Sequence, residues 1–179
     1  MTIVSDLHGV FINGFSIMKL RSEVAEKLFQ VKINPKDYRK DKVIGSGWLN
    51  AEQYRKVSRE VYGKWEYVSR MEPIKGYEYF CDFIKHQGRR LIILTSVVDE
   101  MLVCAKQWLK NHNIGFENIV GVGTGGDRIG LLKDCEANVY IDDRIENLVI
   151  IREDEDLKKI NLFLMKGFYP CEQNISGVK

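Results

Sequence analysis

The sequence lacks the features that mark membrane, secreted and nucleic-acid-binding proteins. No apolar run approaches the ~20 residues that a membrane span requires. No basic segment leads into an apolar stretch near Met1, so no signal peptide is expected. The formal net charge of +2 is too small to indicate a nucleic-acid partner. We therefore expect neither a membrane nor a nucleic acid among the partners of this protein.

Proline and cysteine are also scarce. Three prolines in 179 residues, and no low-complexity tract, argue against long linkers. The cysteines are widely spaced and form no C-x-x-C pair; they are Cys81, Cys104, Cys135 and Cys171. This spacing argues against a zinc site or a disulfide framework and indicates reduced thiols in a cytoplasmic protein.

Short apolar runs alternate with helical patterns along most of the chain. We expect strands before Asp6 and at residues 90–95, 117–120, 139–141 and 160–165. Helices are expected at residues 76–87, 99–111 and 146–151, with a brief one ending near Cys135. Strands that alternate with helices imply right-handed βαβ units and a parallel sheet. The expected fold class is therefore α/β, a Rossmann-like three-layer sandwich around a central parallel sheet.

Residues 15–75 have a different character, because they read as helices only and are basic and rich in aromatic residues. Asn13-Gly14 is expected to break the chain before a helix at residues 17–30. Asn50 is expected to cap a later helix, with Gln53 as its capping-box partner. We interpret residues 15–75 as a small all-helical cap inserted after the first strand, and residues 1–14 plus 76–179 as the α/β core.

Two of the expected strands end in carboxylates. Asp6 follows the first strand, and Asp142 and Asp143 follow the strand at residues 139–141. Ligands bind at the carboxyl ends of parallel strands, so these acids are expected to converge. Carboxylates at such short distances repel one another unless a cation lies among them. Hard oxygen ligands of this kind suit Mg²⁺. Thr95 ends a third strand, where its hydroxyl could donate to a bound oxyanion.

A cation is also needed beside a bound anion, and two residues could supply it. Arg128 follows Gly125-Gly126-Asp127 at the expected start of a helix, whereas Lys133 lies deeper in that helix. Both remain candidates, and we favour Arg128.

Taken in chain order, the segments around Asp6, Thr95, the candidate cation and Asp142 resemble motifs I to IV of the haloacid dehalogenase (HAD) superfamily. The resemblance covers nearly the whole chain, with the helical insertion where that family carries its C1-type cap. It implies a Mg²⁺-dependent phosphatase that acts through an aspartyl-phosphate on a small phosphorylated metabolite. Nucleotides are candidate substrates, because the overall spacing and residues 161–164 are similar to the 5′(3′)-deoxyribonucleotidase branch. The motifs are Asp6-Leu7-His8-Gly9-Val10, Leu94-Thr95-Ser96, a downstream cation, and Ile141-Asp142-Asp143.

The resemblance also implies a role for each residue of the motifs. Asp6 would be the nucleophile that attacks phosphorus. Mg²⁺ would be bound by the carboxylates of Asp6 and Asp142 and by the backbone carbonyl of His8. Asp143 would hold the waters of the metal or the cationic side chain. The transferring phosphoryl group would be bound by Thr95 and Ser96, with Arg128 or Lys133 as the neutralising cation.

His8 departs from the pattern of the family, whose phosphatases have a second aspartate at this position as acid and base. An imidazole with an ordinary pKa of ~6.5 could do that work near neutral pH. It is bulkier, however, and an imidazolium beside Mg²⁺ would be repelled. Three interpretations therefore stay open: a working acid and base, a slowed phosphatase, and a catalytically impaired protein that only binds.

The glycine-rich stretch Gly121–Gly126 offers another alternative. It matches G-x-G-x-x-G, and Asp142 follows at a strand end, as in a dinucleotide-binding fingerprint. The preceding strand and the following helix are short, and this interpretation leaves Asp6 and Thr95 without a role. We therefore rank a dinucleotide-binding protein below a phosphatase. The sequence makes no prediction of the oligomeric state.

Overall fold

The structure is a computed structural model that describes residues 1–123 and 125–165. Its strands are β1 (Thr2–Ser5), β2 (Arg90–Thr95), β3 (Asn118–Gly121), β4 (Ala137–Asp142) and β5 (Asn161–Leu164). They form one sheet in the order β3-β2-β1-β4-β5, and each neighbouring pair is parallel. The prediction of an α/β fold with a central parallel sheet is confirmed.

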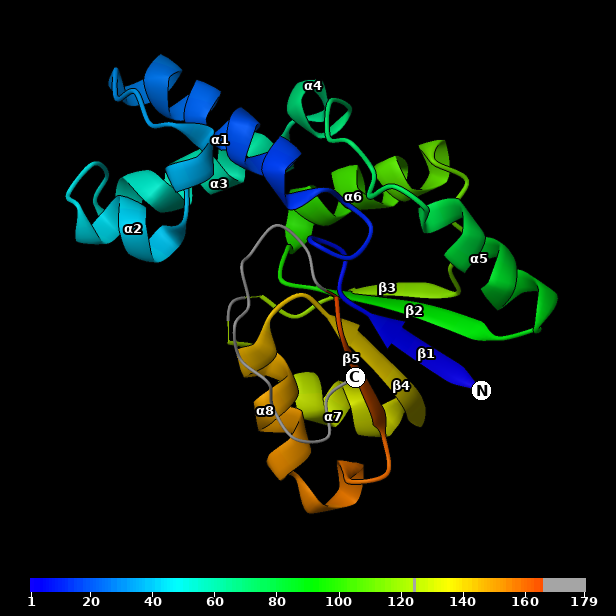
Figure 1. The fold of residues 1–179 in the computed structure, drawn as a ribbon. Coiled ribbons are helices and arrows are strands. Elements are labelled where there is room, and N and C mark those ends of the chain that lie inside the picture. Colours follow the sequence, from blue (N-terminus) through cyan, green and yellow to red (C-terminus); the bar gives the residue numbers. More distant parts are fainter. Residues whose placement is uncertain (124, 166–179) are drawn as a thin grey trace.

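Helices cover both faces of the sheet (Figure 1). α5 (Tyr77–His86) and α6 (Asp99–Asn111) lie on one side, and α7 (Arg128–Asp134) and α8 (Ile145–Glu153) lie on the other. Strands covered on both sides need apolar side chains on both faces. In β4, Tyr140 belongs to one hydrophobic cluster, while Val139 and Ile141 pack against the other. The arrangement is the expected three-layer sandwich.

Every described element between β1 and α5 is helical, as expected. These elements are α1 (Gly14–Phe29), η1 (Pro35–Asp37), α2 (Lys40–Gly45), α3 (Ala51–Gly63) and α4 (Trp65–Val68). The capping box of α3 is confirmed. The Asn50 side chain accepts from the backbone N–H of Gln53, and the Gln53 side chain accepts from that of Asn50, both at 2.9 Å. We call residues 14–68 the helical segment.

The expected chain break at Asn13-Gly14 is instead the start of α1. The Asn13 side chain accepts a hydrogen bond from the backbone N–H of Phe15 at 2.9 Å. An asparagine at this position satisfies a backbone donor that the first turn of a helix leaves without a partner. The helix therefore begins three residues before its apolar stripe does.

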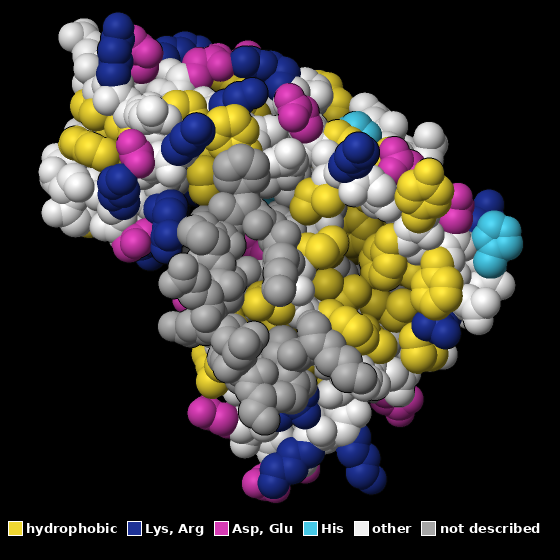
Figure 2. Space-filling model, in the orientation of Figure 1, with side chains coloured by type: hydrophobic (Ala, Val, Ile, Leu, Met, Phe, Trp, Pro, Cys, Tyr) yellow, Lys and Arg dark blue, Asp and Glu magenta, His cyan; other side chains and the backbone are white. Residues whose placement is uncertain are grey.

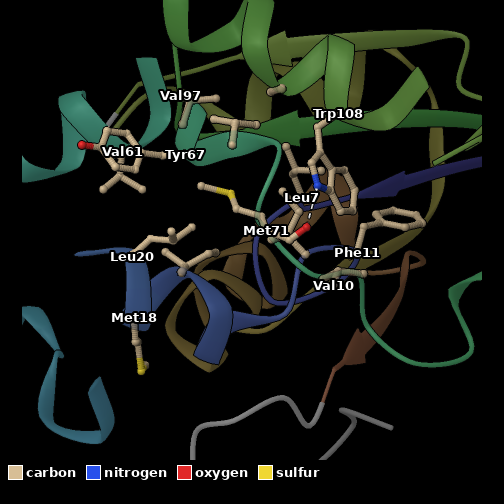
Figure 3. Packing of buried hydrophobic residues seen from close by; sticks show 14 of the residues in the cluster. Leu7, Val10, Phe11, Met18, Leu20, Val61, Tyr67, Met71, Val97 and Trp108 are labelled. Atoms are coloured by element: carbon tan, nitrogen blue, oxygen red, sulfur yellow. Dashed lines mark hydrogen bonds between the residues drawn. The ribbon is translucent and has the colours of Figure 1, made fainter. Parts of the chain in front are cut away.

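The helical segment and the sheet share one hydrophobic core. The cluster contains Leu20, Val61 and Tyr67 from the helical segment together with Ile93 from β2 and Trp108 from α6 (Figure 3). Trp108 is fully buried, and its indole N–H donates to the carbonyl of Met71 at 3.0 Å. The division of the chain into a core and a cap stays a prediction.

The two connections to the helical segment run side by side. The backbone N–H of Asn13 donates to Glu72 at 2.8 Å, and that of Ile74 donates to Phe11 at 2.8 Å. These bonds anchor the loop that follows β1, which carries Asp6 and His8. Consequently, that loop and the base of the helical segment are held in one position relative to the sheet.

None of the described helices combines the length and the apolar composition that a membrane span requires. Cys81, Cys104 and Cys135 are free thiols, whereas Cys171 lies outside the described residues. Figure 2 shows basic side chains spread over the helical segment and apolar side chains gathered beside α5.

Candidate active site

Carboxylates meet where β1 and β4 end. Ser5, the last residue of β1, pairs with Ile141 of β4, so Asp6 and Asp142 follow paired residues of adjacent strands. Carboxylate oxygens of Asp6, Asp142 and Asp143 lie within 4.8 Å of one another. The structure thus brings together the acids that the sequence placed at strand ends.

Asp142 is the most rigidly held of the three acids. It is fully buried, and its Oδ1 accepts from the backbone N–H of Arg144 at 2.8 Å. Its Oδ2 accepts from the Tyr140 hydroxyl and, at 2.8 Å, from the Asn147 amide. Both oxygens are therefore engaged, which suits a fixed ligand better than a nucleophile.

Asp6 lies beside this rigid carboxylate with fewer donors. Its backbone N–H donates to Ile141 at 2.8 Å, which fixes the residue at the end of β1. The pKa of its carboxyl lies well above the ordinary value, first because burial removes it from water and then because Asp142 and Asp143 are close. Arg128, at 3.9 Å, acts in the opposite direction.

Asp143 packs against the loop after β1 at Gly9, where no side chain could fit. Gly9 has a φ of +86°, and a Cβ there would lie 2.0 Å from a carboxylate oxygen of Asp143. Burial, followed by the charge of Asp142, raises the pKa of Asp143 to about 7. Gly9 therefore permits both the turn after Asp6 and the approach of the third acid.

The structure separates the two candidate cations. Arg128 Nη1 lies 3.9 Å from carboxylate oxygens of both Asp6 and Asp142, and it donates to the Tyr140 hydroxyl at 3.1 Å. Lys133 also lies on α7, nearer its C-terminal end, and its contacts are with a different segment of the chain.

Lys133 Nζ lies 3.1 Å from Asp154 and 2.7 Å from Asp156, and its side chain is exposed. Asp156 belongs to a short 3-10 helix, η2 (Glu155–Leu157), which Asp154 caps. Lys133 therefore binds this turn and is not among the groups gathered around Asp6.

Thr95 and Ser96 differ in their placement. Thr95 ends β2 and is fully buried, and its Oγ1 lies 3.4 Å from His8 Nδ1 and 3.5 Å from the backbone nitrogen of Val97. Both contacts are long for hydrogen bonds, so the hydroxyl is held only weakly. Ser96 is exposed.

His8 turns toward the helical segment. The centre of its ring lies 4.7 Å from that of Tyr62 in α3. It also lines a cavity of about 10 Å³, which is room for no more than one water, together with Ile12, Tyr62, Val68, Met71, Val97, Met101 and Ala105. Burial, and then the charge of Arg21, lower the pKa of His8 to about 3. The imidazole is therefore neutral at pH 7.

Sequence reasoning missed the residues that support this site. Tyr140 and Asn147 orient Asp142, and Tyr62 and Arg21 surround His8. Tyr140 carries a signal in retrospect, because it lies two residues before Asp142 on the same face of its strand. The others come from helices, and no spacing in the sequence connects them to a strand end.

The glycine-rich loop does not support a dinucleotide site. Asp127 caps α7, and its side chain accepts from the backbone N–H of Gly130 at 2.7 Å, where a phosphate would otherwise bind. A Cβ on Gly126 would lie 1.8 Å from the Val122 carbonyl oxygen, so close backbone packing explains this glycine. Thr124 of the loop lies outside the described residues.

A hard divalent cation fits the acidic cluster. Asp6, Asp142 and Asp143 present only oxygen ligands, and burial together with the nearby negative charges raises the pKa values of Asp6 and Asp143. A cation among them would reverse that effect, because it favours the ionised forms. Oxygen ligands in small number suit Mg²⁺.

No protein-family model matches the sequence, and no curated protein matches it in sequence. Among solved structures, a predicted phosphatase from Clostridium acetobutylicum is 16% identical, covers 93% of this chain and 85% of its own, and has a TM-score of 0.68. A haloacid dehalogenase-like hydrolase from Streptococcus pneumoniae is 15% identical over 91% and 83%, with a TM-score of 0.66. CbbY from Rhodobacter sphaeroides, solved with phosphate, is 14% identical over 99% and 91%, with a TM-score of 0.64. This chain therefore has the α/β fold of the HAD-superfamily hydrolases.

Proposed function

We propose that this protein is a Mg²⁺-dependent phosphatase that hydrolyses small phosphomonoesters through an aspartyl-phosphate. The observation that carries the proposal is the contrast between two adjacent carboxylates. Asp142 has both oxygens engaged by donors, whereas Asp6 lies beside it and beside Arg128 with fewer bonds. Asp142 is thus suited to be a fixed metal ligand, and Asp6 is suited to be the nucleophile.

In the proposed reaction, an oxygen of Asp6 attacks phosphorus and the bond from phosphorus to the ester oxygen breaks. Water then attacks the aspartyl-phosphate, which restores the carboxylate and releases phosphate. Arg128 neutralises charge on the transferring phosphoryl group, and the Thr95 hydroxyl donates to one of its oxygens. Tyr140 and Asn147 keep Asp142 in place throughout. Ser96, exposed beside Thr95, stays a predicted substrate contact.

Mg²⁺ would be held by the carboxylates of Asp6 and Asp142 and by the backbone carbonyl of His8, with Asp143 nearby. When bound, it would neutralise the acids and draw electron density from the phosphoryl oxygens. We further propose that the helical segment serves as a cap over the site. A cytoplasmic location, expected from the cysteines, and nucleotides as one substrate class stay predictions.

His8 favours the interpretation of a slowed phosphatase. Its ring packs on Tyr62 in an apolar setting, and the charge of Arg21 opposes its protonation. A neutral imidazole can accept a proton from water, but its remaining N–H is too weak an acid to protonate a departing alkoxide. Departure of the leaving group should therefore limit turnover on esters of alcohols.

This expectation can be tested with two kinds of ester. We expect Mg²⁺-dependent hydrolysis of p-nitrophenyl phosphate, whose leaving group needs no proton, and far slower hydrolysis of alkyl and nucleotide monoesters. Since a general acid is worth ~10²–10⁴ in rate, His8→Asp should raise kcat on the alkyl esters by roughly 10²-fold and change the aryl ester little. Steady-state phosphate release measures both.

An unchanged alkyl rate in His8→Asp would show that His8 is not what limits turnover. If the wild type releases no phosphate from any ester with Mg²⁺, the result favours the alternative of a catalytically impaired HAD-like protein that binds phosphorylated ligands. EDTA in place of Mg²⁺ serves as the blank for each substrate.

The choice between the two candidate cations gives a second prediction. Arg128→Met should lower kcat/KM on p-nitrophenyl phosphate by roughly 10²–10³-fold, because it removes a charge aimed at the developing oxyanion. Lys133→Met removes a charge of the same sign from the same helix and should change it less than about threefold. A reversed order would assign the cation to Lys133.

A further inference from the structure

One hydroxyl group in the candidate active site bonds to a carboxylate and to a cation at the same time. Tyr140 is fully buried in β4, and its hydroxyl donates to Asp142 Oδ2. The same oxygen accepts a hydrogen bond from Arg128 Nη1 at 3.1 Å. A phenolic hydroxyl has one proton to donate and lone pairs that accept, so both bonds can form together. Tyr140 therefore connects the proposed metal ligand to the proposed phosphate-binding cation.

The position of this hydroxyl is set by the sheet. β4 lies between β1 and β5, and Tyr140 pairs with Val4 on one side and with Leu162 on the other. Its ring belongs to the same hydrophobic cluster as those two residues and Leu148 of α8. Core strands with buried side chains are among the last parts of a protein to open. The hydroxyl is thus a fixed point to which a longer side chain can be anchored.

The Arg128 side chain depends on such an anchor. Arg128 is the first residue of α7, a helix of seven residues that begins soon after the glycine-rich stretch Gly121–Gly126. Glycine permits many backbone conformations, and an arginine side chain has many rotamers. Among the described residues, the Tyr140 hydroxyl is the one hydrogen-bond partner of the guanidinium, whereas the carboxylates of Asp6 and Asp142 lie at 3.9 Å. Loss of the hydroxyl should therefore release the direction of the guanidinium without removing its charge.

Asn147 holds the same carboxylate without this second contact. It lies in α8, on the same face of the sheet as α7 (Figure 1), and its amide donates to Asp142 Oδ2 at 2.8 Å. Within the part of the chain that the structure describes, Asn147 makes no hydrogen bond to Arg128. Tyr140 and Asn147 thus both orient Asp142, and they differ in whether they also contact the cation.

We propose that Tyr140 is a positioning residue for Arg128, which it aims at the phosphoryl group while it also orients Asp142. The inference rests on the proposed phosphatase function. Tyr140→Phe keeps the ring in its hydrophobic cluster and removes only the hydroxyl. The guanidinium then keeps its charge but loses its fixed direction, so phosphate binding should weaken, though less than it does in Arg128→Met.

Calorimetric titration with two ligands separates the two roles of Tyr140. Tyr140→Phe and Asn147→Ala each remove one donor from Asp142, so each should weaken Mg²⁺ binding by roughly 10–100-fold. Inorganic phosphate is then titrated at saturating Mg²⁺. Because a hydrogen bond to a charged group is lost, Tyr140→Phe should weaken phosphate binding by roughly tenfold, whereas Asn147→Ala should change it less than about threefold. Equal losses of phosphate affinity in the two variants would trace the effect to Asp142 and overturn the proposal, as would an unchanged affinity in Tyr140→Phe.

A double-mutant cycle tests whether the effect passes through Arg128. If Tyr140 acts by aiming the guanidinium, Tyr140→Phe should cost no further phosphate affinity in a protein that already carries Arg128→Met. An equal loss in both backgrounds would show that the hydroxyl only supports the fold of the site, and the proposal would be wrong. The same cycle can be measured as kcat/KM on p-nitrophenyl phosphate, where Tyr140→Phe alone should again cost roughly tenfold.

The result for Tyr140 is distinct from the result for the phosphatase function. If the wild type binds phosphate with Mg²⁺ but hydrolyses no ester, the phosphatase proposal fails, and the titrations still decide the role of Tyr140. If the wild type turns over but the losses in Tyr140→Phe and Arg128→Met are additive, the phosphatase proposal stands and the positioning role fails. A wild type that binds no phosphate contradicts both.

Discussion

Asp6→Asn is expected to abolish Mg²⁺-dependent hydrolysis of p-nitrophenyl phosphate, with a loss of at least ~10³-fold in kcat. An amide cannot attack phosphorus, and loss of a nucleophile removes the covalent route altogether. The substitution changes one oxygen to nitrogen and keeps the shape of the side chain. Phosphate release at saturating substrate measures the effect.

The folded state of Asp6→Asn can be checked independently. Burial and the charges of Asp142 and Asp143 oppose an ionised Asp6, so the neutral amide should raise the melting temperature in EDTA. Loss of activity together with a higher melting temperature would exclude unfolding as its cause. Activity within tenfold of the wild type would contradict the role of Asp6 as nucleophile.

Metal removal should change stability as well as activity. In EDTA at pH 8, we expect the wild type to melt at a lower temperature than with excess Mg²⁺. A ligand at about 100 times its Kd adds ~2.7 kcal/mol to the free energy of unfolding. For a chain of this length, that corresponds to roughly 5–10 °C. Differential scanning fluorimetry with and without Mg²⁺ measures the shift.

Asp143→Asn should reveal, as a dependence on pH, the burial and the repulsion by Asp142 that oppose an ionised Asp143. The pKa of Asp143 rises from an ordinary 3.8 to about 7 in the fold. Because its pKa is raised in the fold, Asp143 makes its full contribution to the free energy of unfolding below about pH 3.8. That contribution is lost as the pH rises through about 7. In EDTA at pH 8, the melting temperature of Asp143→Asn should therefore exceed that of the wild type by several degrees. At pH 5 this difference should be smaller.

The stability of the wild type alone would not isolate Asp143, because His8 changes the free energy of unfolding with pH in the opposite direction. Its pKa is lowered to about 3 in the fold, so the unfolded chain takes up a proton first as the pH falls below 6.5. Asp156→Asn provides the control, since Asp156 is exposed and bound to Lys133. If Asp156→Asn raises the melting temperature at pH 8 as much as Asp143→Asn does, or if Asp143→Asn does not raise it, an ionised Asp143 does not destabilise the site.

Local signals in the sequence were sufficient wherever the determining contacts are short in range. Asn50 and Gln53 cap α3 because their side chains reach backbone groups three residues away. The strands could be recognised because apolar runs buried on both faces leave a clear pattern. The sequence predicts the start of α1 too late, because Asn13-Gly14 is typical of a chain break, whereas in the structure the Asn13 side chain caps the helix.

By itself, the sequence determined that Asp6, Thr95 and Asp142 lie at one edge of a parallel sheet. The reason is that βαβ units bring the carboxyl ends of their strands together whatever the loops do. Tertiary structure alone decided which cation faces Asp6, which donors hold Asp142, and that His8 turns toward Tyr62 and Arg21. Those outcomes depend on how each helix is rotated against the sheet. Packing between distant segments sets that rotation, and no spacing along the chain encodes it.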